Sequence, residues 1–127
     1  MTAPRLDETR ERFFRAITER VPAERIAEIH FFQPIRQGGI ESGVAVVVEE
    51  APDTPRIIVH TARYRLVLKG PDRGKWEASV VAEADAPLVT VDAVVRGVQR
   101  RAGDVDEAVR MEGSEARAIA EHLTGSP

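Results

Sequence analysis

The sequence contains no cysteine in its 127 residues. Disulfides, thiol nucleophiles, thiolate zinc sites and iron–sulfur clusters are therefore excluded. It also lacks any apolar run close to the roughly 20 residues that a membrane-spanning helix needs. The opening stretch, MTAPRLDETRERFF, is charged and has no apolar segment typical of a secretory signal. We therefore expect a cytoplasmic protein that makes no membrane contact.

Histidine and lysine are scarce. His30, His60 and His122 show none of the HxH, HxxxH or HExxH spacings of metal sites, so we predict no metal and no cofactor. Only Lys69 and Lys75 among the 18 basic residues are lysine, and the rest are arginine. The net charge of −3 provides no overall attraction to nucleic acid or to anionic lipid.

Length and hydrophobic pattern predict a single α+β domain over residues 1–127. We expect an N-terminal helix, a four-stranded antiparallel meander sheet, and two or three C-terminal helices packed on the sheet. The expected helices span 4–21, 88–103 and 114–125, a capping-box pattern covers 104–113, and the expected strands span 28–36, 40–50, 56–69 and 75–84. Residues 22–28 fit either a further helical turn or the lead-in to the first strand.

Two of the expected helices carry apolar stripes that can cover one face of the sheet. Thr2 is the expected N-cap of the first helix, with Pro4 in its first turn. The stripes are Leu6, Phe13, Phe14 and Ile17 in the first helix, and Val91, Val94, Val95 and Val98 in the helix at 88–103. In the last helix we expect Ile119, Ala120 and Leu123 to point inward.

The turns predict the strand register. The pairs are Gln37–Ile40 and Phe31–Val46 from a two-residue Gly38-Gly39 turn, then Val48–Ile58 and Leu68–Trp76. This register collects one apolar face: Ile29, Phe31, Ile35, Val44, Val46, Val48, Ile58, Ala62, Tyr64, Leu66, Leu68, Trp76, Ala78 and Val80. A slip of one residue would move a strand's whole set to the other face. His30 and His60 project from opposite faces in this register and cannot share a ligand.

One candidate ligand pocket consists of His60, Tyr64 and Trp76 on the core face. Tyrosine and tryptophan supply apolar area together with polar groups, as small-molecule pockets require. The alternative is a core histidine that simply hydrogen-bonds a neighbour.

A candidate anion-binding hairpin spans residues 63–75. Its basic residues are Arg63, Arg65, Lys69, Arg73 and Lys75. Its glycines could let backbone amides approach a phosphate. The hairpin lacks interleaved exposed aromatics, so nucleic acid is a disfavoured partner. The alternative is a solvated face in which Arg63 and Arg65 pair with Glu77 and Glu83 of the next strand.

The second face of the expected sheet carries an apolar patch. It consists of Phe32, Ala45, Val47, Ile57 and Val59. A free sheet face should read polar, so we predict that a second copy covers the patch and makes a homodimer. Val47→Asp should then dissociate the dimer and leave a folded monomer. The alternative is that the chain's own terminal helices cover the patch, in which case Val47→Asp unfolds the protein.

No nucleophile elbow, P-loop or dinucleotide-binding motif is present. Ser42 is the only serine that the register brings near a histidine, His60. The sequence therefore favours a non-enzymatic protein that acts through self-association or protein–protein interaction. The alternatives are a small-molecule binding protein or minor enzyme with a pocket between sheet and helices, and a nucleic-acid or phosphate binder using the hairpin.

Overall fold

The computed structural model describes residues 6–50, 56–86 and 91–124. Its elements are α1 (Glu8–Thr18), the short 3-10 helix η1 (Ala23–Arg25), β1 (Ile26–Phe32), β2 (Ile35–Gln37), β3 (Ile40–Glu50), β4 (Ile57–Val67), β5 (Trp76–Ala86), α2 (Val91–Arg101), β6 (Glu107–Glu112) and α3 (Gly113–Thr124). The strands form one antiparallel sheet in the order β5-β4-β3-β1-β6, with β2 also paired to β3. The predicted α+β class, N-terminal helix and C-terminal helices are confirmed. The sheet has six strands rather than the four expected.

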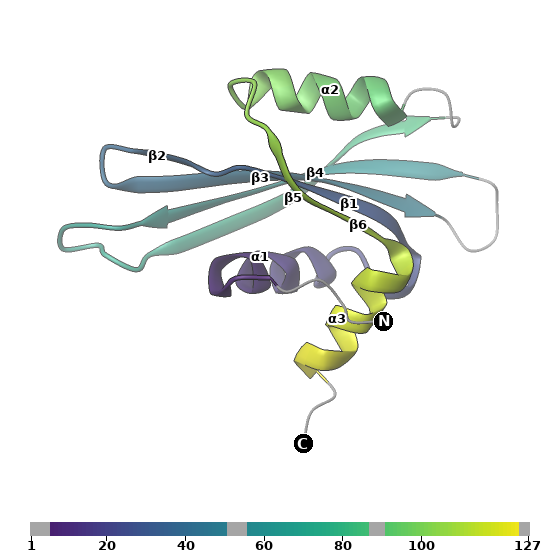
Figure 1. Ribbon diagram of the computed structural model, residues 1–127, viewed down its shortest axis with the longest axis horizontal. Helices are drawn as coiled ribbons and strands as arrows, with labels where there is room; N and C mark the ends of the chain where they lie inside the picture. Colours follow the sequence, from purple (N-terminus) through teal and green to yellow (C-terminus); the bar gives the residue numbers. More distant parts are fainter. Residues whose placement is uncertain (1–5, 51–55, 87–90, 125–127) are drawn as a thin grey trace.

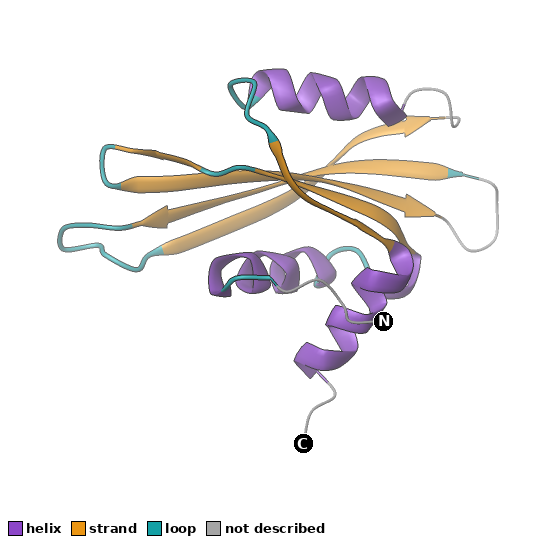
Figure 2. Cartoon of the chain, in the orientation of Figure 1, coloured by secondary structure: helices purple, strands orange, loops and turns teal. Residues whose placement is uncertain are grey.

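Helices cover both faces of the sheet (Figure 1, Figure 2). Helices α1 and α3 lie on one face, called here the α1/α3 face, and α2 lies on the other, the α2 face. The core of the α1/α3 face contains Phe13, Phe14, Ile17, Ile29, Phe31, Ala45, Val47, Ala62, Tyr64 and Met111 among others. The core of the α2 face is smaller and consists of Phe32, Val46, Val59, Val95 and Val98. The expectation that the helices at 4–21 and 88–103 share one face is therefore wrong.

Helix α1 forms where its periodicity predicts it. Phe13, Phe14 and Ile17 are buried, as the apolar stripe requires. The cap is Asp7, whose carboxylate accepts a hydrogen bond from the Arg10 backbone N–H at 2.7 Å. The expected cap, Thr2, and Pro4 lie outside the described residues.

The β2–β3 hairpin contains the predicted glycine turn. Gln37 pairs with Ile40, so the loop has two residues. Gly38 and Gly39 have φ values of 61° and 77°. This left-handed region is what the favoured two-residue hairpin turn requires, and a side chain would strain it.

The first expected strand is interrupted at Pro34 and divides into β1 and β2. Proline has no backbone N–H for the ladder, and the Gln33 N–H donates instead to a carbonyl just before β6. The pairing of β1 with β3 is therefore shifted by one residue from the predicted register, and Phe31 lies opposite Ala45 rather than Val46.

The β3–β4 pairing also differs by one residue from the prediction. Val48 lies opposite Val59 rather than Ile58. Because of these two one-residue shifts, the side chains of β3 point to the faces opposite to those predicted, whereas those of β1 and β4 keep their predicted faces. The residues that move to the α2 face are Ile35, Val44, Val46 and Val48, and those that move to the α1/α3 face are Ala45 and Val47.

The β4–β5 pairing differs from the prediction by two residues. Trp76 pairs with Leu66 rather than Leu68. An even shift preserves the face, so Trp76 and Val80 pack on the α1/α3 core as expected.

The segment 104–113, whose sequence carries a capping-box pattern, contains strand β6 rather than a helix. Val109 and Met111 alternate inward and lie opposite Phe31 and Ile29 of β1. This alternation is typical of a strand and outweighs the capping-box pattern.

The patch predicted to form a homodimer is covered within the chain. Phe32 and Val59 are 3% and 1% exposed beneath α2, and Ile57 packs on the same core. Ala45 and Val47 are fully buried on the opposite face. The expectation of an uncovered apolar face is wrong, because the stripe of α2 packs on it. The homodimer loses this support and stays a prediction.

None of the helices in the described part of the chain has the length and apolarity needed to cross a membrane.

Candidate functional site

Two of the three residues of the predicted ligand pocket, Tyr64 and Trp76, contact each other, whereas the His60 ring contacts Glu49. Tyr64 and Trp76 stack with their ring centroids 4.9 Å apart, and Phe13 meets Tyr64 edge-on at 4.7 Å. Tyr64 is only 6% exposed. His60 lies on the same face, but its Nε2 atom is 2.7 Å from Glu49 Oε1. Tyr64 and Trp76 are thus part of the aromatic core, and His60 has the simple hydrogen-bonding partner of the alternative interpretation.

Tyr64 anchors a buried polar group. Its hydroxyl donates to Glu41 Oε2 at 2.7 Å, and Arg36 Nε donates to Glu41 Oε1 at 2.7 Å. Glu41 is 3% exposed. Burial, together with the hydrogen bond and charge of Glu41, raises the pKa of Tyr64. The Tyr64 hydroxyl therefore stays protonated and holds the carboxylate.

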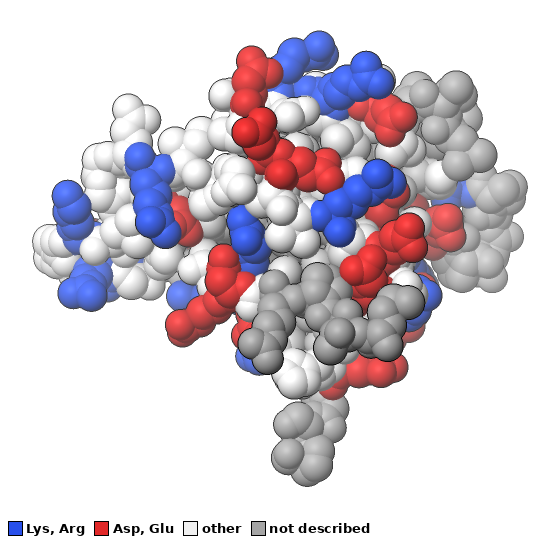
Figure 3. All heavy atoms as spheres, viewed as in Figure 1, with Lys and Arg blue, Asp and Glu red and all other residues white. Residues whose placement is uncertain are grey.

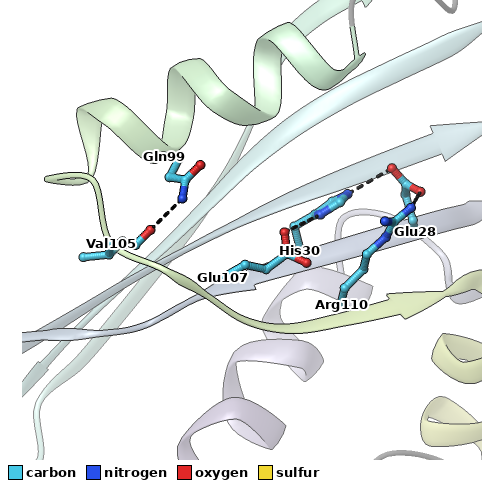
Figure 4. A network of polar contacts seen from close by, with 6 residues as sticks. All are labelled: Glu28, His30, Gln99, Val105, Glu107 and Arg110. Atoms are coloured by element: carbon cyan, nitrogen blue, oxygen red, sulfur yellow. Dashed lines mark hydrogen bonds and ion pairs between the residues drawn. The ribbon is translucent and has the colours of Figure 1, made fainter.

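His30 of β1 contacts two carboxylates, Glu107 of β6 and Glu28 of its own strand (Figure 4). Its Nδ1 is 3.1 Å from Glu107 Oε2 and its Nε2 is 2.9 Å from Glu28 Oε1. Arg110 donates to the other Glu28 oxygen at 3.2 Å. An ionised carboxylate can only accept, so both histidine contacts are hydrogen bonds only when both ring nitrogens carry protons.

The contacts with His30 and Arg110 lower the pKa of Glu28. Burial alone would raise that pKa, but hydrogen bonds and charge from His30, followed by those from Arg110, hold it below its ordinary value of 4.5. A carboxyl whose pKa is lowered on folding stabilises the folded state above its unfolded pKa. That stabilisation is lost as the pH falls through the folded pKa.

We expect Glu28→Gln to lower the free energy of unfolding by about 1–2 kcal/mol near neutral pH. The difference from the parent protein should shrink as the pH falls below 4.5, where Glu28 itself takes up a proton. Urea unfolding at a series of pH values measures both. Glu24→Gln, at an exposed position, is the matched control. If the difference in unfolding free energy between the parent protein and Glu28→Gln did not change with pH, the lowered pKa of Glu28 would be contradicted.

The two histidines do not meet. His30 lies opposite Val46 and His60 opposite Val47, which are neighbours on β3 and point to opposite faces. Ser42 lies on the face opposite His60, so that predicted proximity is wrong. Among the described residues, no group of three or more His, Asp and Glu side chains is placed to hold a metal ion.

The predicted anion-binding residues fall into two groups. Arg63 and Arg65 project from β4 on the α2 face and line an open groove of about 530 Å³. Figure 1 shows that the two hairpins extend past the end of α2, which leaves this part of the face uncovered. The remaining three, Lys69, Arg73 and Lys75, are exposed around the β4–β5 turn and do not line the groove. Lysine and arginine side chains gather around this end of the molecule (Figure 3).

This groove, called here the arginine groove, has a floor set by the strand register. Two rows cross it: Ser42, Arg65 and Glu77 in one, and Val44, Arg63 and Ser79 in the next. Ile35 extends the first row on β2, and Arg101, Ala102 and Val105 form a wall at the end of α2. The floor is polar along its centre and apolar at its margin.

The guanidinium groups of Arg63 and Arg65 are available to a ligand. Neither makes a hydrogen bond or ion pair within the described parts of the chain. Arg65 lies directly opposite Glu77, but the expected ion pair does not form between them. Two arginines two residues apart on one strand face stand roughly 7 Å from each other. Such a pair can bind one anionic group between them or two groups on one ligand.

Comparison with known proteins gives no relative. No protein family, no curated protein and no solved structure shows a significant match to the chain.

Sequence reasoning found Arg63 and Arg65 but missed the other members of the arginine groove. Arg101 ends α2, where a cation complements the helix dipole, so its place in the sequence gives no sign of a groove. Ser42 and Ser79 carry no signal of their own. Only the strand register and the position of α2 bring them beside the arginines.

Proposed function

We propose that this protein binds a small organic anion, a carboxylate or a phosphate monoester, in the arginine groove. The observation that carries the proposal is the pair Arg63 and Arg65, which face one groove without a partner among the described residues. The volume of about 530 Å³ lies within the roughly 300–1,000 Å³ range of small-molecule sites.

The chemistry of the groove fits an anion. The planar guanidinium group presents paired N–H donors that match the oxygens of carboxylate and phosphate. The hydroxyls of Ser42 and Ser79 lie in the same rows as Arg65 and Arg63 and add uncharged donors. Together these groups supply hydrogen bonds on both sides of a bound anion.

The margin of the groove favours an organic ligand over a bare inorganic ion. Ile35 is 39% exposed there, beside Val44 and Val105. Apolar atoms of a ligand would cover this surface, and each buried CH₂ contributes about 0.8 kcal/mol. Glu77, at the end of one row, disfavours a second anionic group elsewhere on the ligand and can instead accept a hydrogen bond from a ligand hydroxyl or amine.

The proposal is one of binding without a reaction. The hydroxyl groups in the lining are those of Ser42, Ser79 and Tyr64, of which the last donates to Glu41, and no histidine is among the described residues that line the groove. Self-association, the role that the sequence favoured, rested on an apolar patch whose residues are buried within the chain, some beneath α2 and some on the α1/α3 face. Nucleic-acid binding by the hairpin gains no support, because Lys69, Arg73 and Lys75 lie away from the groove.

Phenyl phosphate is a suitable ligand for the test because it combines a dianion with an apolar ring. We expect a ¹H–¹⁵N NMR titration to shift the amides of β4 and β5 around Arg63, Arg65 and Ser79. Arg63→Gln/Arg65→Gln should weaken binding by about tenfold or more, since each charge-assisted hydrogen bond contributes more than about 1.4 kcal/mol.

The control for this experiment is Arg73→Gln/Arg96→Gln, which removes the same charge at exposed positions outside the groove. It should weaken binding by less than about threefold, because charges this far from the ligand attract it only weakly through the screening salt. Equal loss in both double variants, or amide shifts that map elsewhere, would overturn the proposal.

A further inference from the structure

Strand β5 is an open edge of the sheet. It pairs with β4 on one side and with no other strand among the described residues. Its ladder with β4 is regular from Trp76 to Ala82 and then changes register. This stretch contains no proline and no lysine, the residues that commonly protect an edge from further pairing. Its outer backbone groups are thus available to another extended chain.

A second hollow runs beside this edge on the α1/α3 face. Its volume is about 440 Å³, and it lies between the α1 region and β5. We call it the α1–β5 hollow. Arg12, Arg15 and Arg20 line it from the helix side, and Glu19 is the one acidic residue among the described residues of its lining. Trp76 and Val80 of β5 form the opposite wall.

The positive charge of the hollow is largely uncompensated. Arg12 stacks over the Trp76 ring at 4.5 Å, an interaction that keeps its charge. The side chains of Arg15 and Arg20 make no hydrogen bond or ion pair with any residue that the structure describes. An occupant of this hollow should therefore carry negative charge.

We propose that β5 and the α1–β5 hollow form a docking site for an acidic, extended peptide segment of a partner protein, which adds as a strand to the β5 edge. Main-chain hydrogen bonds to β5 would supply affinity, and alternate side chains would enter the hollow. Carboxylates at those positions meet Arg15 and Arg20. Glu77 and Ser79 of β5 also line the arginine groove, but Arg63 and Arg65 take no part in this site, so the proposal does not rest on anion binding in that groove.

The other alternate positions of the added strand face the α2 side of β5. Glu77 and Ser79 lie on that side, together with Val81, which is 55% exposed. Glu77 disfavours acidic residues there, and Val81 favours apolar ones. The segment should thus alternate acidic residues with neutral or apolar ones.

A second copy of this chain fits the site poorly. If β5 paired with β5 of another copy, the side chains entering each hollow would be Trp76, Ala78 and Val80, which carry no charge. The arginines of both copies would remain without an anion. The charge of the hollow therefore selects a different, acidic partner.

A labelled peptide of about nine residues, with glutamate and valine alternating, spans the regular part of β5 and tests the proposal by fluorescence polarisation. We expect saturable binding that weakens as salt is added. The same peptide with lysine in place of glutamate should not bind. N-methylation of the backbone amides along one edge of the peptide should abolish binding, because it removes the main-chain hydrogen bonds, while N-methylation along the other edge should be tolerated.

Variants locate the site. Arg15→Glu/Arg20→Glu should weaken peptide binding by about tenfold or more, since charges that meet across an interface become repulsive. Arg73→Glu/Arg96→Glu changes the net charge equally at exposed positions outside both sites and should have less than about a threefold effect. Circular dichroism confirms that each variant is folded.

Three results would overturn the proposal. One is absence of binding up to about 1 mM peptide, the limit of weak association. Another is unchanged affinity when the amides of either edge are methylated, which would indicate charge attraction without strand addition. The third is a concentration-dependent dimer in sedimentation that Val81→Lys dissociates, since a second copy would then occupy the edge.

Discussion

Val47→Asp is expected to unfold the protein. Val47 is fully buried on β3, in the core between the sheet and helices α1 and α3. An aspartate there would carry its carboxylate into a fully buried position among apolar core side chains. The penalty of several kcal/mol is comparable with the whole stability of a typical domain, about 5–15 kcal/mol.

Circular dichroism and urea unfolding measure this loss directly. Val81→Asp is the matched control, because the same substitution is then made on a strand position that is 55% exposed. It should change the free energy of unfolding by no more than about 0.5 kcal/mol. A folded, monomeric Val47→Asp protein derived from a parent dimer would contradict the buried position and restore the interface predicted from sequence.

The wrong prediction for Val47 shows when hydrophobic alternation fails to identify which face of a strand is buried in which core. In β3, the run Val44-Ala45-Val46-Val47-Val48 is apolar at every position, because helices cover both faces of the sheet. Alternation identifies the inner face only when the outer face is polar. When both faces of a strand are buried, its hydrophobic pattern fits two registers that differ by one residue equally well.

The two slips around β3 also cancelled each other. Pro34 shifts β1 by one residue against β3, and the β3–β4 pairing shifts by one in return. Strands β1 and β4 therefore kept their predicted faces, and with them His30, His60 and Tyr64. The helical stripes of α1, α2 and α3 were predictable because each has one polar side.

The polar sites depended on contacts distant in sequence. His30 meets Glu107 across 77 positions, and this contact exists because β6 pairs with β1. The local sequence around Asp104 and Glu107 fits a helix cap equally well, so the strand was missed. Arg63 and Arg65 were predictable as a pair, since they alternate on one strand, whereas the wall that makes a groove of their surroundings comes from the end of α2.

Gly43→Ala is expected to destabilise the protein by about 3–5 kcal/mol. Gly43 lies directly opposite Tyr64, whose ring covers the glycine. A Cβ atom at position 43 would stand 2.0 Å from Tyr64 Cε1 and 2.5 Å from Cζ, so the ring must move. The ring cannot turn aside cheaply, because Trp76 stacks on it and Phe13 meets it edge-on.

Displacement of the ring also breaks the hydrogen bond from Tyr64 to Glu41. That carboxylate is 3% exposed, and Arg36 would be its one remaining partner among the residues that the structure describes. A buried acceptor that loses its donor costs about 1–3 kcal/mol, and more when it is charged. The cost therefore adds to the steric one, and it is the reason that a single methyl group has so large an expected effect.

Trp76 is the only tryptophan of the chain, so its fluorescence and near-ultraviolet dichroism report directly on the stack with Tyr64. Both signals should change in folded Gly43→Ala, and the urea midpoint should fall. Gly97→Ala is the matched control, because position 97 lies within α2 and an added Cβ there meets only an Arg101 side-chain nitrogen at 3.8 Å. Alanine in a helix should stabilise by about 0.5–1 kcal/mol. If both alanine variants were equally stable, the Tyr64 ring could leave Gly43 without cost, and the Tyr64–Glu41 pair would not be a rigid part of the fold.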